Sequence, residues 1–351
     1  DERDDELAPA ALVAVELGAE LLVLAEGAAG ARLMGELIPG LREMLHGELG
    51  VVLPGVHVRA AAPDVPPSGY RVLLGEVPMA GALVDLERVL VVCDPAQAAQ
   101  LGLEDARPAE APGVSAALVS IPLAQVDKAQ QNGLPLIDTP TRVTLHLGHI
   151  VRRYAFELVG IQETQQLLDH LERTHPALVG EVVPKLVTIQ TLTDVLRRLV
   201  EEGVSIRNLR DILQALAEHG GTEADPVVLT EHVRTALRRQ LSYAFAPSGA
   251  LRVLVLDPVI EDTVRESIQR TDKGSYLAME PELSHDIIAA IGRELSALPS
   301  DEPLPVVLTN MEIRRYVRRL VELELPDLAV LSYGELEPTV QVQPLARVAV
   351  A

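Results

Sequence analysis

Two histidines, His146 and His149, come closest in this sequence to the pattern of a metal site. Three positions apart, they can share one face of a helix, a spacing that paired metal ligands use. No carboxylate stands in a fixed local pattern that would complete the set, and a structural metal takes about four ligands. We therefore expect an ordinary helix at these positions, with no metal ligands and no cofactor.

Catalytic motifs are absent from the sequence. It contains no Gly-x-x-x-x-Gly-Lys-Ser/Thr phosphate loop, no Gly-x-Gly-x-x-Gly turn, no Gly-x-Ser-x-Gly elbow and no His-Glu-x-x-His helix. Acid pairs such as Glu201-Glu202 and Glu322/Glu324 are present, but carboxylates on solvated helix faces greatly outnumber catalytic dyads. The sequence therefore predicts no catalytic residues and a protein that is not an enzyme.

The composition indicates folded domains with aliphatic cores. The chain has 351 residues, 48% of them hydrophobic, but only 2% are aromatic and none is Trp, so Leu, Val, Ile and Ala must fill the cores. A formal charge of −21 repels phosphate groups, which argues against nucleic acid and anionic lipid as partners. The single cysteine, Cys93, ends an apolar run and is typical of a buried strand thiol.

Apolar periodicity predicts α/β structure in the first third of the chain. A helical stripe over 33–45 is followed by extended segments at 51–58, 70–74 and 86–92. The stretch 94–113, rich in Ala, Pro and acids, indicates a small inserted lobe.

The rest of the chain changes character near Thr141. A helical pattern continues for about a hundred residues, with N-caps expected at Thr191, Ser205 and Asp225 and three amphipathic helices that pack together. Strand-like runs then alternate with helices after residue 250, which predicts a small, mainly parallel sheet. The fold class expected is α+β or mixed α/β and multidomain, with an all-helical part between α/β parts.

Paired arginines recur near the expected helix ends. They can complement the carbonyls of the last helical turn, or form ion pairs between subunits, and the sequence favours neither reading for the helical part. The pairs are Arg152-Arg153, Arg197-Arg198, Arg238-Arg239, Arg314-Arg315 and Arg318-Arg319.

Three dense motifs, at 157–169, 204–217 and 229–239, resemble the large export-gate protein family of bacterial type III secretion. The likeness extends from Val56-His-Val-Arg59 to Leu331-Ser-Tyr-Gly-Glu-Leu336, so it covers nearly the whole chain. The segment Gly274-Ser-Tyr-Leu-Ala-Met-Glu-Pro281 is more similar to the injectisome (virulence) branch than to the flagellar branch. An uncharacterised α/β enzyme with an appended helical domain is the less favoured alternative.

The resemblance implies the cytosolic half of a bacterial inner-membrane protein, whose membrane-spanning N-terminal half precedes it. The start at Asp1 and the lack of a long apolar run agree with an excised piece. It implies a nine-membered ring beneath the export channel that receives export chaperones with their secreted substrates, and also gatekeeper and ATPase-stalk proteins. The four implied subdomains are 1–87 with 134–153, the inserted 88–133, the helical 154–243 and the C-terminal 244–351.

The resemblance also implies where partners bind. Chaperone and substrate docking falls near a hydrophobic depression between the first two subdomains, where this sequence departs from the flagellar pattern, and the residues expected there are Pro112, Val114, Leu136 and Thr141. An equally weighted alternative is that these residues close the lobe's own core. For the ring contact of the helical part, we expect Arg207 and Arg210 to meet Glu163 or Asp169 of a neighbouring copy.

Overall fold

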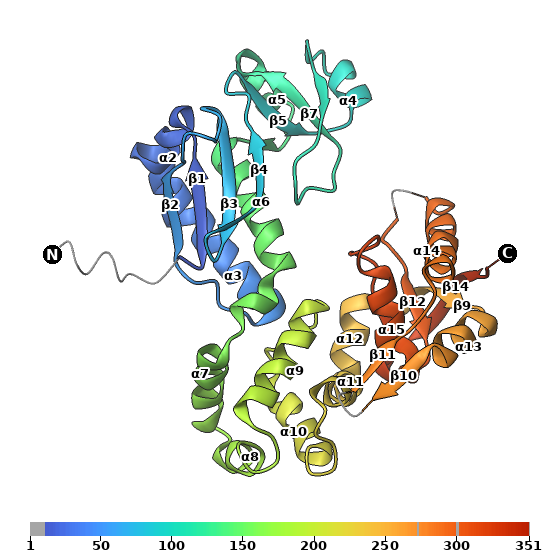
Figure 1. Ribbon diagram of the computed structural model, residues 1–351. Helices are drawn as coiled ribbons and strands as arrows, with labels where there is room; N and C mark the ends of the chain where they lie inside the picture. Colours follow the sequence, from blue (N-terminus) through green and yellow to red (C-terminus); the bar gives the residue numbers. More distant parts are fainter. Residues whose placement is uncertain (1–10, 272–273, 300–301, 351) are drawn as a thin grey trace. The chain divides into compact units, whose positions relative to one another are not determined.

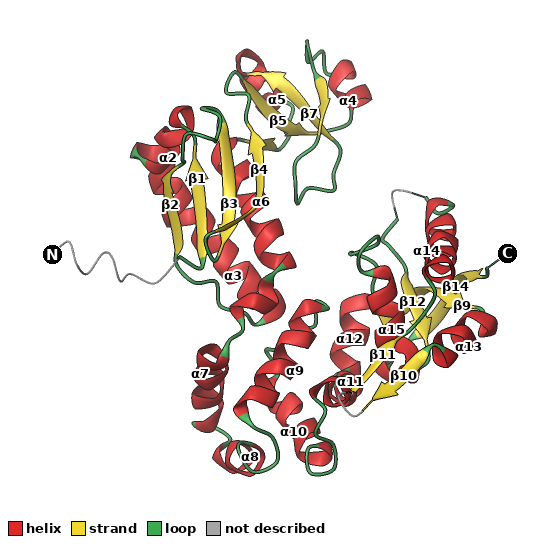
Figure 2. Cartoon of the chain, in the orientation of Figure 1, coloured by secondary structure: helices red, strands yellow, loops and turns green. Residues whose placement is uncertain are grey.

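The computed structural model describes residues 11–271, 274–299 and 302–350, and the chain divides into two compact units between Val159 and Gly160 (Figure 1). Each unit has its own sheets and helices, coloured by type in Figure 2. Among the described residues, no helix combines the length and the apolar character needed to cross a bilayer.

The first unit begins with a four-stranded sheet in the order β2-β1-β3-β4. The central strand β1 is buried at every position, runs parallel to β2 and pairs antiparallel with β3. Helices α2, α3 and α6 lie behind this sheet in Figure 1. The strands are β1 (Val13–Leu17), β2 (Val56–Ala60), β3 (Gly69–Leu74) and β4 (Val77–Leu83).

The predicted helical stripe over 33–45 is helical throughout, and Pro39 does not break it. Pro39 closely follows the π-helical turn η2, the point at which the regular hydrogen-bond ladder is already altered, and the helix continues through it into α3. A short π-helical segment, η2, leads into α3. The elements of this run are η1 (Ala19–Ala25), α2 (Gly27–Arg32), η2 (Leu33–Leu37) and α3 (Ile38–Leu49).

The inserted lobe is a second sheet in the order β6-β7-β5-β8, with α4 and α5 on one face. Its edge strand β8 leads directly into α6, and Leu145 of α6 packs against the other face of the sheet. The elements are β5 (Arg88–Val92), α4 (Pro95–Gln100), β6 (Arg107–Ala109), β7 (Leu118–Pro122), η3 (Leu123–Gln125), α5 (Val126–Gln131), β8 (Leu136–Ile137), α6 (Thr139–Arg153) and η4 (Ala155–Leu158).

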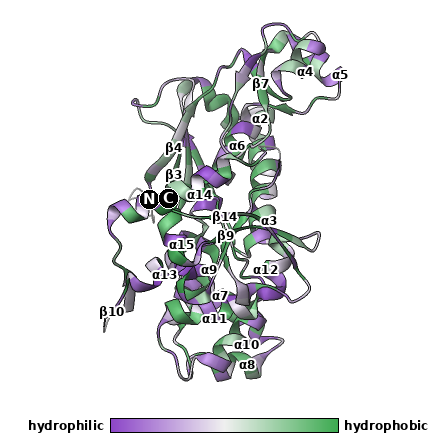
Figure 3. Ribbon diagram, turned by 90° about the vertical axis from the view of Figure 1, so that its right-hand side faces the viewer, coloured by the Kyte–Doolittle hydropathy of each residue, from purple (hydrophilic) through white to green (hydrophobic). Residues whose placement is uncertain are grey.

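The second unit begins with a helix bundle, α7 to α12, and the three expected amphipathic helices are present in it. In Figure 3 these helices carry both hydrophobic (green) and hydrophilic (purple) residues, as amphipathic helices do. Only Asp225 caps its helix as expected; α9 is capped by Thr188, and α10 begins after Asn208. The helices are α7 (Ile161–Glu172), α8 (Pro176–Val182), α9 (Ile189–Glu201), α10 (Leu209–His219), α11 (Pro226–Ala236) and α12 (Arg238–Phe245).

The chain ends in a C-terminal lobe built on a sheet in the order β13-β12-β9-β14, in which every pairing is parallel, as the sequence predicted. The mixed α/β fold class is thereby confirmed. The elements are β9 (Ala250–Leu256), α13 (Pro258–Glu266), the hairpin β10 (Ile268–Thr271) and β11 (Gly274–Leu277), α14 (Pro281–Ser296), β12 (Val306–Thr309), α15 (Met311–Val321), β13 (Val330–Ser332), η5 (Tyr333–Glu335) and β14 (Gln341–Val348).

Candidate functional site

Thr141 lies in the first turn of α6, where its side chain already has two partners. Its backbone N–H and its hydroxyl both donate to the carboxylate of the N-cap Asp138, at 3.1 and 2.5 Å. Arg32 from α2 donates to the Thr141 hydroxyl at 3.2 Å and pairs with Asp138. Burial alone would raise the pKa of the Asp138 carboxyl, but the hydrogen bonds from Thr141 and Arg32 outweigh it and lower that pKa. Thr141 is therefore part of a helix cap that is tied to α2.

Pro112 and Val114 lie in the turn that precedes β7. Pro112 is exposed, whereas Val114 is half-buried and packs against the apolar cluster of Leu90, Leu118 and Ile137, which Leu145 of α6 also joins. The turn sits close to α6, because a Cβ added at Gly113 would lie 2.9 Å from the Leu145 carbonyl oxygen. Val114 thus contributes to a local core, and Pro112 is the exposed neighbour.

Leu136 is half-buried on the opposite face of the same sheet. It precedes Ile137 in β8, and adjacent strand residues point to opposite faces. Ile137 joins the cluster of Val114, while Leu136 packs against the cluster that contains Val89 and Val91. The structure therefore does not gather Val114 and Leu136 into one patch, although Leu136 and Thr141 both lie close to the β8 edge.

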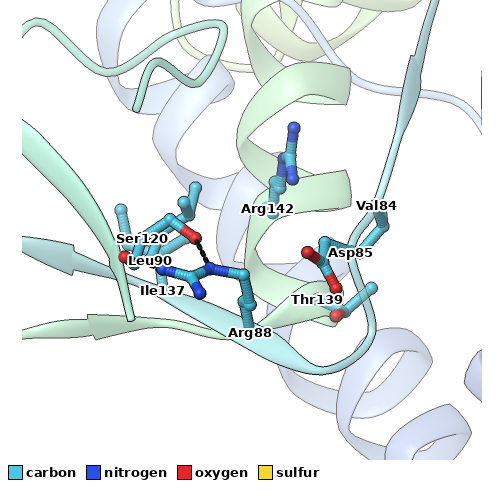
Figure 4. Close-up of a pocket in the computed structure, with 8 residues that line it drawn as sticks. All are labelled: Val84, Asp85, Arg88, Leu90, Ser120, Ile137, Thr139 and Arg142. Atoms are coloured by element: carbon cyan, nitrogen blue, oxygen red, sulfur yellow. Dashed lines mark hydrogen bonds between the residues drawn. The ribbon is translucent and has the colours of Figure 1, made fainter. Parts of the chain in front are cut away.

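A small polar cavity of about 30 Å³ lies where the chain passes from the first sheet into the inserted lobe (Figure 4). Arg88 spans it, donating from Nε to the Ser120 hydroxyl at 2.9 Å and pairing with Asp105. Figure 4 shows Arg142 further along α6, pointing away from Arg88. This volume holds about one water molecule and no organic ligand. The remaining lining residues are Val84, Asp85, Leu90, Ile137 and Thr139.

The helix that carries His146 and His149 is α6, so the expected helix is present. His146 is buried and shares a hydrogen bond with the Tyr70 hydroxyl, from Nδ1, at 3.0 Å. Within the described residues, no group of three or more His, Cys, Asp and Glu side chains is arranged to hold a metal ion. His146 is engaged in packing the first unit.

The four residues expected at the ring contact all lie in the helix bundle. Arg207 and Arg210 are exposed at the start of α10, and Asp169 is exposed on α7, where it accepts a hydrogen bond from Gln165 at 2.7 Å. Glu163 is half-buried and caps α7 by accepting from the Gly160 N–H at 3.0 Å. Asp169 and both arginines thus lie at the surface of the bundle, while Glu163 caps its own helix.

A groove of about 500 Å³ runs beside the Asp169 surface of α7. Its walls come from α7, α8 and the start of α9, and they combine apolar side chains with a polar rim. The lining residues are Gln165, Leu168, Glu172, Val179, Val183, Pro184, Thr188, Ile189 and Gln190. This groove was not expected from the sequence.

A group of interior charges in the second unit was not expected from the sequence: the buried Glu231, Arg234, Arg314 and Glu335, with the partly buried Glu202. Three of them lie inside segments that carried the family resemblance, Glu231 and Arg234 in 229–239 and Glu335 in 331–336. The sequence carried one signal for this group, because charged residues such as Glu231 and Arg234 fall on the face of their helix that is otherwise apolar and buried. The arginine pairs were expected at helix ends or subunit contacts instead.

Comparisons with known proteins agree on one family. The sequence matches the FHIPEP family over residues 2–341. It is 35% identical over 310 residues to the Low calcium response locus protein D of Yersinia pestis, covering 88% of this chain and 44% of that protein. It is 33% identical over 330 residues to the flagellar biosynthesis protein FlhA of Bacillus subtilis, covering 93% and 48%. The chain therefore spans less than half the length of these two relatives.

Solved structures show the same fold. CdsV of Chlamydia pneumoniae, 34% identical, superposes with a TM-score of 0.87 and covers 98% of this chain and 99% of its own. CdsV has also been solved in complex with CdsO, with a TM-score of 0.87, 33% identity and 99% and 100% coverage. The nonameric EscV cytosolic domain from the type III secretion system, 27% identical, gives a TM-score of 0.74 and 97% and 98% coverage. The resemblance found in the sequence motifs is thus confirmed, and this chain belongs to the FHIPEP family of type III and flagellar export-gate proteins.

Proposed function

We propose that this chain is the cytosolic part of a bacterial inner-membrane export gate, which assembles as a nine-membered ring and passes secreted proteins to the export channel. The observation that carries the proposal is the TM-score of 0.87 with CdsV over 98% of the chain, together with the nonameric state of the related EscV cytosolic domain. Its subdomains are taken as 1–87 with 134–153, 88–133, 154–243 and 244–351.

The injectisome branch is the preferred assignment, with the flagellar branch as the alternative. The solved EscV domain from the type III secretion system supports the first, and the 33% identity to FlhA keeps the flagellar branch as the second candidate. The family match and the solved relatives are those of secretion-gate proteins, which supports a non-enzymatic gate component over an enzyme.

Protein partners are proposed in three classes: export chaperones with their substrates, gatekeeper proteins and ATPase-stalk proteins. The complex of the related CdsV with CdsO supports the general idea of a protein partner for this fold. For chaperone docking, we propose the surface around Pro112, Val114, Leu136 and Thr141. Since Val114 and Leu136 face opposite sides of the second sheet, a partner that reaches both must straddle the β8 edge.

The docking proposal is tested best at its most exposed residue. Pro112→Asp places a charge on the surface without disturbing the local core, so it should weaken binding of a cognate chaperone–substrate complex at least tenfold, through the cost of desolvating the new carboxylate. The matched control is Pro63→Asp, in an exposed loop of the first sheet. Isothermal titration of both variants measures the effect. Equal affinities for Pro112→Asp and Pro63→Asp would move the docking site elsewhere.

A further inference from the structure

Five charged side chains lie buried where the helix bundle, α7–α12, meets the C-terminal lobe, β9–β14, within the second unit. Arg234 and Arg314 are 2% and 0% exposed, and Glu335 is 1% exposed. Glu231 is 8% exposed, while the Glu202 side chain, at 18%, has the most contact with water. Charges taken this far from water must be satisfied by one another.

Arg314 is the arginine that the C-terminal lobe contributes to this cluster. From α15 it donates to both oxygens of Glu231, through Nε at 2.7 Å and Nη2 at 2.5 Å. It also donates to both oxygens of Glu202, through Nη1 at 2.6 Å and Nη2 at 3.0 Å. Both carboxylates belong to the helix bundle, so one guanidinium of the C-terminal lobe is clamped by two acids of the bundle.

Arg234 makes the reverse connection. It lies on α11 of the bundle, and its Nε donates to the Glu335 carboxylate of η5 in the C-terminal lobe. Its Nη1 lies 3.2 Å from Oε2 of Glu202, the same oxygen that Arg314 contacts. Glu335 in turn accepts a hydrogen bond from the Ser332 N–H, which fixes it at the end of β13. Each part therefore supplies an arginine that the other part holds.

Glu202 provides the closer of two links between two ion pairs. Arg314–Glu231 and Arg234–Glu335 are each balanced in charge, and they approach each other directly, with Nε of Arg314 3.9 Å from Oε1 of Glu335. Glu202 contacts both guanidinium groups at shorter distances, 2.6 Å to Arg314 and 3.2 Å to Arg234, and so strengthens one network of three carboxylates and two arginines. Arg314 holds Glu231 and Glu202 through bidentate contacts, whereas Arg234 donates to Glu335 through Nε and faces Glu202 as an ion pair without a hydrogen bond from Nη1. Bidentate contacts are directional, unlike apolar packing, so two of them on one guanidinium resist rotation as well as separation.

We propose that this network is a latch that fixes one orientation of the C-terminal lobe on the helix bundle, with Glu202 as the bridging residue that makes the orientation unique. Phe245 of α12 packs against the apolar cluster of Leu251, Val306 and Leu331 in the C-terminal lobe, which gives adhesion, and the network gives direction. The inference uses only contacts within one copy of the chain, so it does not depend on ring assembly or on chaperone docking.

The sequence motifs acquire a role through this latch. Glu231 and Arg234 come from the motif at 229–239, and Glu335 comes from Leu331-Ser-Tyr-Gly-Glu-Leu336. These two segments are about a hundred residues apart in sequence, yet their charged side chains meet in one buried cluster. A motif that serves only a surface contact would have no need to place its charged residues in the interior.

The latch can be tested by measuring the distance between its two sides in the monomer. Spin labels are attached to cysteines introduced at Glu218 on α10 and Ser296 on α14, both exposed, in a Cys93→Ala background that removes the native thiol. Double electron–electron resonance then gives the distance distribution at a concentration where light scattering finds monomers only. The protein is the whole 351-residue chain.

The deciding variant is Glu202→Gln, which keeps the shape of the side chain and leaves two balanced ion pairs behind. It should fold, and its distance distribution should be at least twice as wide as that of the parent. The matched control, Glu201→Gln, changes the exposed neighbouring residue and should keep the parental width. An unchanged width in folded Glu202→Gln overturns the proposal.

A second variant, Glu335→Gln, removes the buried Arg234–Glu335 ion pair by neutralising the carboxylate that the C-terminal lobe supplies. If it folds by circular dichroism, a broadened distribution supports the latch and a parental width contradicts it. If it does not fold, Glu202→Gln alone decides. Because all measurements are made on monomers, a failure of the latch leaves the proposed export function standing, and a failure of ring assembly leaves the latch standing.

Discussion

The hydroxyl of Tyr70 on β3 lies 3.0 Å from Nδ1 of His146 on α6, and the two rings meet edge to face in the interior of the first unit. Burial, with nearby His149 and Arg142, lowers the pKa of His146 below its ordinary value. Burial also raises the pKa of Tyr70 to about 12, so that its hydroxyl stays protonated near neutral pH. The pair is therefore a neutral contact between β3 and α6. Protonation of His146 at low pH places a charge in the interior and weakens this contact.

The first prediction concerns this pair. As the pH falls below about 6.5, the unfolded chain binds a proton at His146 before the folded chain does, so stability should decline until the folded pKa is reached. His146→Leu should flatten that decline and cost about 1–3 kcal/mol at neutral pH, because the Tyr70 hydroxyl loses its partner. Urea unfolding between about pH 5 and 8 measures both effects.

The control for this prediction is His170→Gln, at an exposed position on α7. It should retain the parental pH profile. If His146→Leu and the parent lose stability equally steeply over this pH range, the assignment of the decline to His146 is wrong.

The second prediction concerns the buried arginine of the latch. Arg314→Met leaves Glu231 and Glu202 without their shared cation, so it should lower the free energy of unfolding by about 3–5 kcal/mol. Arg319→Met, exposed on the same helix, should change it by less than about 0.5 kcal/mol. Urea titration followed by circular dichroism compares the two, and similar losses in both variants would rule out a special role for Arg314.

The third prediction is an acid transition at Glu202. Burial favours the neutral form, but Arg234 and Arg314 outweigh it and lower the pKa of Glu202 from 4.5 to about 2. The stability that this carboxylate contributes should thus be complete above about pH 4.5 and be lost as the pH falls toward 2. In Glu202→Gln this part of the pH dependence should disappear. Acid titration of the unfolding free energy would contradict the assignment if both chains gave parallel curves.

The fourth prediction separates docking from packing at Val114. Because Val114 packs against Leu90, Leu118 and Ile137, Val114→Asp should lower stability by about 1–3 kcal/mol, whereas Pro112→Asp should leave the melting temperature unchanged. Differential scanning calorimetry measures both variants. A Val114→Asp protein that melts like the parent would show that the side chain does not close the lobe's core and would favour a purely external role.

Much of the fold follows from local sequence signals. The alternation after residue 250 predicted the parallel C-terminal sheet, since buried strands and crossover helices have distinct periodicities. Two N-caps were misplaced because Thr191 and Ser205 satisfy the cap pattern as well as Thr188 and Asn208 do. Tertiary packing decides which of the candidate cap residues begins each helix, and no single cap residue determines that position.

The candidate docking site and the buried charge cluster were less predictable, because tertiary packing decides them too. Leu136 and Val114 are both apolar, but they pack in different clusters on opposite faces of the second sheet, because Leu136 alternates with Ile137 along β8. Arg314 sits in an arginine pair that is typical of a surface, and only its partners from α9 and α11, far away in the sequence, make it an interior residue. Such long-range charge pairing leaves no local pattern.

The fifth prediction concerns the ring contact. Arg207→Glu with Arg210→Glu should prevent assembly, because these exposed cations are proposed to meet acids such as Asp169 of the next copy. Raising the salt concentration to about 1 M should weaken assembly of the parent by screening the same charges. The control, Arg152→Glu with Arg153→Glu in the first unit, should assemble normally. Sedimentation velocity distinguishes assembled from monomeric protein, and parental assembly by the Arg207/Arg210 double variant would remove these residues from the contact.

The central claim, a ring-forming export-gate component, is tested most directly by the mass of the assembled chain. Light scattering coupled to size exclusion, across increasing protein concentration, should reveal a species of nine copies of 37.8 kDa, about 340 kDa, in equilibrium with monomers. Electron microscopy of that fraction should show closed rings. A small symmetric oligomer, such as a dimer or tetramer that persists at every concentration, would contradict the account.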